Sequence, residues 1–155
     1  MTLPHERMNS ERIGKILQPK CKPYFLGVFA SDRLPARLPP RRPLLLVCNT
    51  DKHDRPGEHW VVIYLGTRRG EYFDSYGQPP IPLFERYLTK FCSRWIFNDK
   101  KIQSFMTEFC GHYCIFYCLY KRLGYSLKSI ADCFTEDETL NDFMVHKFVC
   151  DLISM

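Results

Sequence analysis

The 155-residue sequence lacks the features that would define a membrane, secreted or disordered protein. No apolar run approaches the ~20 residues that cross a bilayer, and the run Leu44–Cys48 is among the longest. The first ten residues, MTLPHERMNS, contain no apolar core of a secretory signal, so we expect an intracellular protein that is not secreted. Because 45% of the residues are hydrophobic and 15% are aromatic, disorder is excluded. We therefore expect one globular domain over residues 1–155.

The sequence also lacks a CxxC pair, although it contains eight cysteines. In a reducing compartment these cysteines are expected to be thiols rather than a disulfide framework. Cys110, Cys114 and Cys118 recur every four residues with His112 nearby. One helix face cannot supply a complete tetrahedral shell, so we expect no metal site, with Cys114 and Cys118 in the core.

Apolar periodicity and turn residues predict an α+β fold in which helices flank a small mixed or antiparallel sheet. We expect strands at residues 44–49, 59–65, 71–75 and 95–97, with the second and third joined as an antiparallel hairpin. We expect helices at residues 6–17, 83–91, 110–123, 127–134 and 140–153. Four prolines and four arginines in residues 31–43 predict an exposed basic loop.

The predicted hairpin brings two polar residues onto one face. If its turn centres between residues 67 and 68, His59 lies opposite Tyr76. Asp74 is then the diagonal neighbour of His59 on the same face, with ~7–8 Å between their Cα atoms. A carboxylate that accepts one ring N–H leaves the other imidazole nitrogen free to act as a base. The alternative is a structural hydrogen bond without catalysis.

Cys110 stands at the start of the most apolar predicted helix and is followed by Gly111. The positive end of the helix dipole and the unpaired N–H groups of an exposed first turn favour its thiolate, whereas burial would oppose it. Those N–H groups could hold an oxyanion, and Gly111 would leave room for a substrate carbonyl. Gln103, seven residues earlier, could supply a neutral amide donor to that oxyanion. The alternatives are a buried apolar cysteine and an ordinary surface glutamine.

Taken in chain order, His59, Asp74, Gln103 and Cys110 resemble the adenovirus endopeptidase family, part of a wider group of cysteine proteases that includes the SUMO-specific proteases. Four segments are similar to family segments: His59–Trp60, FDSYG at 73–77, PYFLG at 23–27 and NT at 49–50. The similarity covers residues 21–130. Asp74 stands where the adenoviral enzymes typically have Glu, as in the SUMO-protease branch.

This resemblance implies a cysteine endopeptidase with the nucleophile at a helix N-terminus. Cys110 would be the nucleophile, His59 the general base and then acid, Asp74 its orienting partner, and Gln103 an oxyanion donor. Trp60 would wall a narrow substrate cleft. The expected substrates are glycine-containing sites in viral or mobile-element structural precursors. The alternatives are a protease that removes a ubiquitin-like modifier and a catalytically inactive interaction module of the same fold.

The resemblance also implies activating partners but no organic cofactor. Cys92 is the positional candidate for a disulfide to an activating viral peptide. DNA is the second expected activator, consistent with the net charge of +5, although solubilising surface charge explains that value equally well. The cations expected to track phosphates are Arg33, Arg37, Arg41, Arg42, Arg68, Arg69, Lys100 and Lys101. The expected location is a virion or the host nucleus or cytoplasm.

Overall fold

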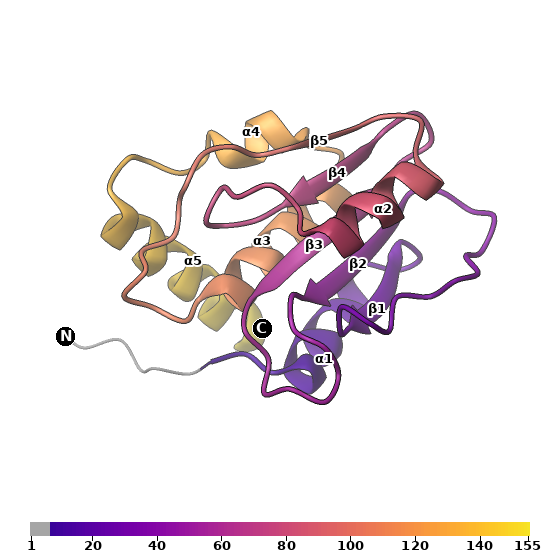
Figure 1. The fold of residues 1–155 in the computed structure, drawn as a ribbon. Coiled ribbons are helices and arrows are strands. Elements are labelled where there is room, and N and C mark those ends of the chain that lie inside the picture. The colour runs from indigo at the N-terminus through magenta and orange to yellow at the C-terminus, as the bar shows by residue number, and fades with distance from the viewer. Residues whose placement is uncertain (1–6) are drawn as a thin grey trace.

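A computed structural model describes residues 7–155 as a five-stranded mixed sheet between helices (Figure 1). The strands, in their order across the sheet, are β1 (Phe25–Phe29), β2 (Leu44–Asn49), β3 (Trp60–Leu65), β4 (Gly70–Phe73) and β5 (Trp95–Phe97). β1 and β2 are parallel, as are β4 and β5, whereas β2, β3 and β4 are antiparallel. The expected α+β class with a small mixed sheet is confirmed.

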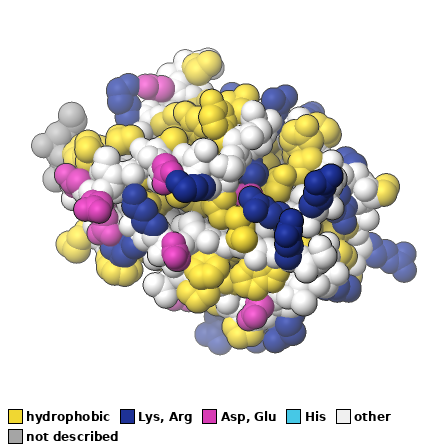
Figure 2. All heavy atoms as spheres, turned by 90° about the horizontal axis from the view of Figure 1, so that it is seen from above, with side chains coloured by type: hydrophobic (Ala, Val, Ile, Leu, Met, Phe, Trp, Pro, Cys, Tyr) yellow, Lys and Arg dark blue, Asp and Glu magenta, His cyan; other side chains and the backbone are white. Residues whose placement is uncertain are grey.

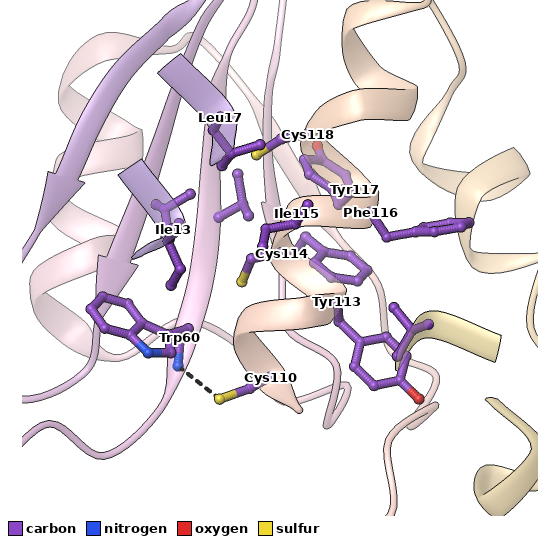
Figure 3. Packing of buried hydrophobic residues seen from close by; sticks show 14 of the residues in the cluster. Ile13, Leu17, Trp60, Cys110, Tyr113, Cys114, Ile115, Phe116, Tyr117 and Cys118 are labelled. Atoms are coloured by element: carbon purple, nitrogen blue, oxygen red, sulfur yellow. Dashed lines mark hydrogen bonds between the residues drawn. The ribbon is translucent and has the colours of Figure 1, made fainter. Parts of the chain in front are cut away.

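The helices cover the sheet unequally. They are α1 (Ser10–Lys20), α2 (Pro82–Phe91), α3 (Cys110–Arg122), α4 (Leu127–Ala131) and α5 (Glu138–Ile153). Side chains alternate along each strand, so Leu45, Val47 and Val62 pack toward α1, α3, α4 and α5, while α2 covers the other face. Figure 3 shows α3 at the centre of the larger core. No helix formed by residues 7–155 is long and apolar enough to cross a membrane.

The hairpin of β3 and β4 has the predicted register. Val62 pairs with Phe73 and Leu65 with Gly70, which places His59 opposite Tyr76 when the register continues. β4 ends at Phe73 rather than at residue 75, because the chain bends as Asp74 accepts the Gly77 N–H at 2.8 Å. His59 and Asp74 therefore lie just outside strands β3 and β4.

β1 was not among the predicted strands. Its five residues, FLGVF, include Gly27 and do not alternate in polarity, so the segment carries a weak strand signal. It pairs in parallel with β2, with an irregularity between Phe25 and Gly27. The basic segment at 31–43 is thus part of the crossover that joins two neighbouring parallel strands.

The predicted first helix had wrong boundaries. α1 begins at Ser10 because the Asn9 side chain caps it by accepting the Arg12 N–H at 2.8 Å. Pro19 lies inside the last turn instead of ending the helix, where little of the hydrogen-bond ladder remains to be broken. Residue 6, the predicted start, lies outside the described residues.

A buried ion pair ties the hairpin to α3. Glu71 of β4 is 2% exposed, accepts the Tyr117 O–H at 2.6 Å and pairs with Lys121 Nζ at 3.0 Å. Removing one member would leave a buried charge uncompensated, so the pair fixes how α3 sits against the sheet.

Candidate active site

Polar and nucleophilic side chains meet where β3 begins, β4 ends and α3 begins. His59 directly precedes β3, Asp74 directly follows β4, and Cys110 is the first residue of α3. The hairpin brings the first two together, and packing of α3 on β3 adds the third. The structure therefore assembles three of the predicted residues at one point.

His59 lies between an acid and a thiol. Its Nε2 is 2.6 Å from Asp74 Oδ1, and Cys110 lies near enough to raise the pKa of the imidazole. Because Nε2 is engaged by the carboxylate, Nδ1 is the nitrogen that remains for the sulfur. Asp74 is itself held in place, since the same oxygen accepts the Tyr76 N–H at 2.8 Å and Asn98 bonds both backbone groups of Asp74.

The environment favours a protonated imidazole. Burial lowers the pKa of His59, but the hydrogen bonds to Asp74 and Cys110 and their negative charges outweigh it and raise the pKa to about 9. A protonated His59 beside the Cys110 sulfur places a proton donor next to a nucleophile. The pair can therefore attack an electrophilic carbon and then donate a proton to a leaving group.

Cys110 is more enclosed than predicted. The expectation of an exposed helix start is wrong, because residues 110–118 are all buried and Cys110 is 6% exposed. The cause is long-range packing, since the chain before α1 and Trp60 close over the first turn. Cys110 Sγ accepts the backbone N–H of Trp60 at 3.4 Å, as Figure 3 shows.

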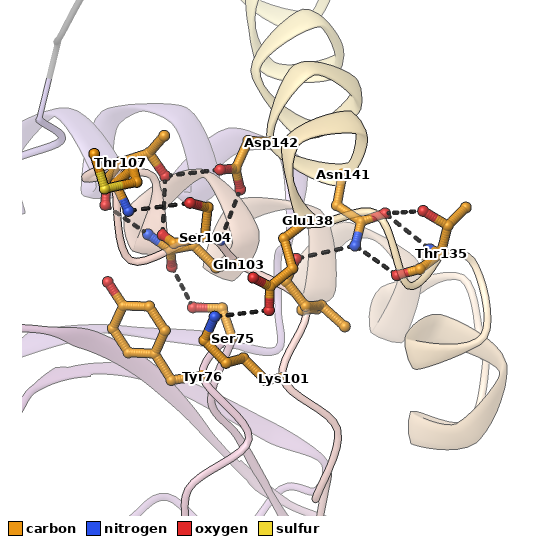
Figure 4. A network of polar contacts seen from close by, with 12 residues as sticks. Ser75, Tyr76, Lys101, Gln103, Ser104, Thr107, Thr135, Glu138, Asn141 and Asp142 are labelled. Carbon is orange, nitrogen blue, oxygen red and sulfur yellow. Dashed lines mark hydrogen bonds and ion pairs between the residues drawn. The ribbon is translucent and has the colours of Figure 1, made fainter.

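Gln103 is fully buried in the segment that leads into α3. Its Oε1 accepts the Ser75 O–H at 2.6 Å, and its Nε2 donates to the Thr107 carbonyl at 3.1 Å (Figure 4). An amide nitrogen carries two hydrogens, so one N–H remains beyond the bond to Thr107. These bonds fix the amide orientation next to the residue that follows Asp74.

Gly111 and Trp60 contact the chain's own N-terminal segment. A Cβ at Gly111 would come within 2.6 Å of Met8 Cβ, so glycine permits this close approach. Trp60 is 7% exposed and its Nε1 donates to the Met8 carbonyl at 3.0 Å. On the side where a Cβ would stand, the space beside Gly111 is thus filled by Met8 and Ile13 rather than left open. Substrate binding by Gly111 and Trp60 stays a prediction.

An aromatic wall beside His59 was not predicted from the sequence. The Tyr76 ring stacks on His59 at 4.6 Å between centroids, and Phe105 packs on Tyr76 at 4.9 Å. Phe105 and Met106 are 71% and 85% exposed, and Lys101 Nζ lies 3.9 Å from the Phe105 ring centre. Adjacent large apolar residues in an otherwise polar loop were the available signal. The wall extends from the imidazole into solvent.

Cys92 is not brought to this site. It caps the end of α2 on the opposite face of the sheet, and its sulfur packs against Gly70. The deeply buried Cys114 and Cys118, whose pKa values burial raises, are core residues. Within residues 7–155, no group of three His, Cys, Asp or Glu side chains is arranged to hold a metal ion.

Comparison with known proteins finds likeness at the level of structure. No family model and no curated protein sequence matches the chain. The ASFV pS273R protease superposes with a TM-score of 0.55 at 25% identity, over 70% of this chain and 44% of that one. ChlaDub1 of Chlamydia trachomatis also gives 0.55, at 14% identity over 72% of this chain and 59% of that one.

The first of these neighbours is a protease by its name, and both share the fold of this chain. The resemblance to the adenain-like group of cysteine proteases is therefore confirmed in the fold. The chain spans less than two thirds of either neighbour's length.

Proposed function

We propose that the protein is a cysteine endopeptidase in which Cys110 is the nucleophile. The observation that carries this proposal is the position of His59, which is hydrogen-bonded to Asp74 and lies near Cys110. The fold shared with cysteine proteases supports it. In this mechanism Asp74 orients His59 and stabilises its positive charge.

The reaction has two stages. The Cys110 thiolate attacks the scissile carbonyl carbon, forming a C–S bond, and His59 Nδ1 donates its proton to the departing amine as the C–N bond breaks. His59 then takes a proton from water, which attacks the thioester and releases Cys110. The free N–H of Gln103 and the Cys110 backbone N–H would hold the oxyanion, each donor contributing about 2.7–4 kcal/mol in the transition state.

The proposed substrates are proteins cleaved at glycine-containing sites. Trp60 and the aromatic wall of Tyr76 and Phe105 would narrow the approach to Cys110, and glycine has the least bulk to exclude. Because one structural neighbour is a protease of ASFV, we propose structural precursors of a virus or mobile element as the natural targets. The protein would then act inside cells or virions, in the host nucleus or cytoplasm.

A deconjugating protease is the second candidate, and the likeness to ChlaDub1 favours it. Such an enzyme would cleave after the C-terminal Gly-Gly of a folded modifier. It would prefer the intact modifier over a short peptide with the same ending, whereas an endopeptidase would cut both. Comparing kcat/KM for these two substrates separates the candidates.

We also propose DNA and a viral peptide as activators. Figure 2 shows Lys and Arg side chains gathered mainly on the half of one face that holds α2, with most Asp and Glu on the other half. Arg41 and Arg42 donate to backbone carbonyls, and within residues 7–155 neither is ion-paired. Burial raises the pKa of Cys92 and lowers its thiolate fraction, which disfavours a disulfide to a peptide. Salt-sensitive stimulation by DNA tests the first activator.

Active-site labelling tests the function. Cys133 and Cys150 are exposed and serve as internal controls, since a small undirected alkylating agent should reach them first. An electrophilic peptide ending in glycine should instead modify Cys110 alone, and His59→Ala should abolish this labelling. Mass spectrometry of the digested protein locates the adduct. Labelling that follows exposure, with no preference for Cys110, would overturn the proposal in favour of an inactive module.

A further inference from the structure

A cavity of about 400 Å³ lies beside the candidate active site. Its walls are the segment leading into α1, the end of β1 and the β2–β3 loop, which lie side by side in Figure 1. Trp60 lines this cavity and its backbone N–H donates to Cys110 Sγ, so the cavity and the nucleophile share a wall. The volume is within the range of ligand-binding pockets.

A buried donor in the cavity wall lacks an acceptor. Asn49 is 4% exposed, and its Oδ1 accepts the N–H groups of Asp51 at 2.8 Å and Glu58 at 3.1 Å. Those bonds fix the amide so that Nδ2 faces Gly57, and within residues 7–155 Nδ2 has no acceptor. An unpaired buried N–H is costly, and the Gly57 that it faces also lines the cavity, which places this donor at the cavity wall.

The cavity wall is predominantly positive. Arg7, Lys52 and Arg55 line it against a single carboxylate, that of Asp51. Within residues 7–155, none of these three cations is ion-paired, although Arg7 donates to the Gly57 carbonyl. His53 also lines the wall, but its ring nitrogens are engaged by Asp32 and Arg33. Such a wall favours an anionic acceptor over a neutral one.

We propose that this cavity is a substrate subsite that binds an acidic side chain close to the scissile bond. The inference rests on the proposed protease function and gives its substrates a further property. The carboxylate would accept from Asn49 Nδ2 and lie near Lys52 and Arg55. An extended peptide advances about 3.3–3.6 Å per residue, so a chain at Cys110 passes Trp60 within about two or three residues.

A series of peptides, each with one charged or neutral residue at a different position, tests the subsite. Fluorogenic peptides with a central Gly-Gly carry one Glu, Gln or Lys at each of the three positions on either side of the glycines. At one position, or two adjacent ones, Glu should raise kcat/KM about tenfold over Gln, the effect of one good charge-assisted contact. Lys at that position should lower kcat/KM below the value for Gln. High salt should reduce both differences.

Three substitutions connect the preference to the cavity. Lys52→Gln and Arg55→Gln alter exposed side chains, and the double variant should bring the Glu-to-Gln ratio close to one. Asn49→Asp keeps the oxygen that accepts from Asp51 and Glu58 but replaces the free donor, so it should also remove the preference. The matched control is Lys147→Gln, which removes an exposed lysine paired with Asp151 on α5. This control should keep the full ratio.

Binding to the Cys110→Ala variant separates the two hypotheses, because it does not require turnover. Glu-selective binding of labelled peptides without cleavage or Cys110 labelling by the wild type would overturn the protease function and leave the acidic subsite standing. Equal Kd values for Glu and Gln peptides at every position would overturn the subsite. A Glu preference that survives the Lys52/Arg55 double variant would overturn it as well.

Discussion

Two histidines flank the first turn of α3, and both are nearly buried. His59 is 9% exposed and His112 is 3% exposed, yet their surroundings differ. His59 is hydrogen-bonded to Asp74 and lies near Cys110, whereas His112 packs against the rings of Phe109 and His146 and its Nδ1 has no partner within residues 7–155. The pKa of His59 is raised to about 9, and that of His112 is lowered to about 4.

The contrast shows that burial alone does not make a histidine reactive. For His112, burial is the largest cause of the lowered pKa, and the nearby His146 and Arg12 add to it. For His59, burial acts in the same direction, but an acid and a thiol reverse the result. Chemistry at this helix start therefore depends on the partners that the hairpin supplies.

The largest test of this contrast replaces the sulfur itself. Cys110→Ala should lower kcat by about 10⁶-fold, as loss of a nucleophile does, and change the melting temperature little. Cys114→Ala, one turn further into the core, should cost about 1 kcal/mol of unfolding free energy and keep kcat. Enzyme kinetics and thermal melts compare the two. If Cys110→Ala unfolds the protein and Cys114→Ala does not, Cys110 is a structural residue.

The next test removes the carboxylate charge of Asp74 beside His59. Asp74→Asn should lower kcat/KM by about 10⁴-fold, the loss seen when the acid of a triad becomes an amide. In the wild type, kcat/KM should decline as pH rises through about 9, where His59 loses its proton. The residual activity of Asp74→Asn should decline at a lower pH. An unshifted alkaline limb would show that Asp74 does not act on His59.

A third test compares the two histidines through stability. Both histidines have a pKa of 6.5 in the unfolded chain. As pH drops from 6.5 toward 4, His112 takes up a proton in the unfolded chain but not in the folded one, so the unfolding free energy should fall. The contribution of His59 is present below 6.5 and is lost as pH rises toward 9. Denaturant unfolding across pH should thus show a maximum near 6.5.

The control for this profile is His112→Phe. It removes the titrating group, so it should flatten the acid limb by about 2–3 kcal/mol and leave the alkaline limb in place. An acid limb that is unchanged in the variant would assign the loss to other groups.

The smallest expected effect concerns the outer end of the aromatic wall. Phe105→Ala should raise KM about three- to tenfold with little change in kcat, because an exposed side chain that contacts substrate contributes uniform binding. Leu123→Ala is the matched control at the far end of α3, where Leu123 is 66% exposed. Equal KM values in both variants would remove Phe105 from the substrate site.

Local patterns were sufficient to predict much of the fold. The apolar run of β2, the hairpin register and the apolar α3 follow from polarity patterns within short segments, so the positions of His59 and Asp74 could be predicted. β1 was missed because its stability comes from pairing with β2 rather than from its own pattern.

The enclosure of the site could not be predicted, because it depends on residues distant in sequence. Met8 reaches Gly111, and Trp60 bonds Cys110 across 50 positions. The two bonds of the Gln103 amide and the unpaired Asn49 donor are likewise set by tertiary packing. The residue types predicted the chemistry of the site, whereas its solvent accessibility is determined only by the folded chain.

The contact of Met8 with Gly111 has a consequence for when the protein becomes competent during synthesis. Met8, which packs against Gly111, and Trp60, which donates to Cys110 Sγ, leave the ribosome before α3 does, as do His59 and Asp74. A partly made chain therefore holds the imidazole and the acid before the thiol of Cys110 is in place beside the imidazole. If the protein is the proposed protease, it could not cleave other nascent chains on the same polysome until its α3 has emerged and packed against the sheet.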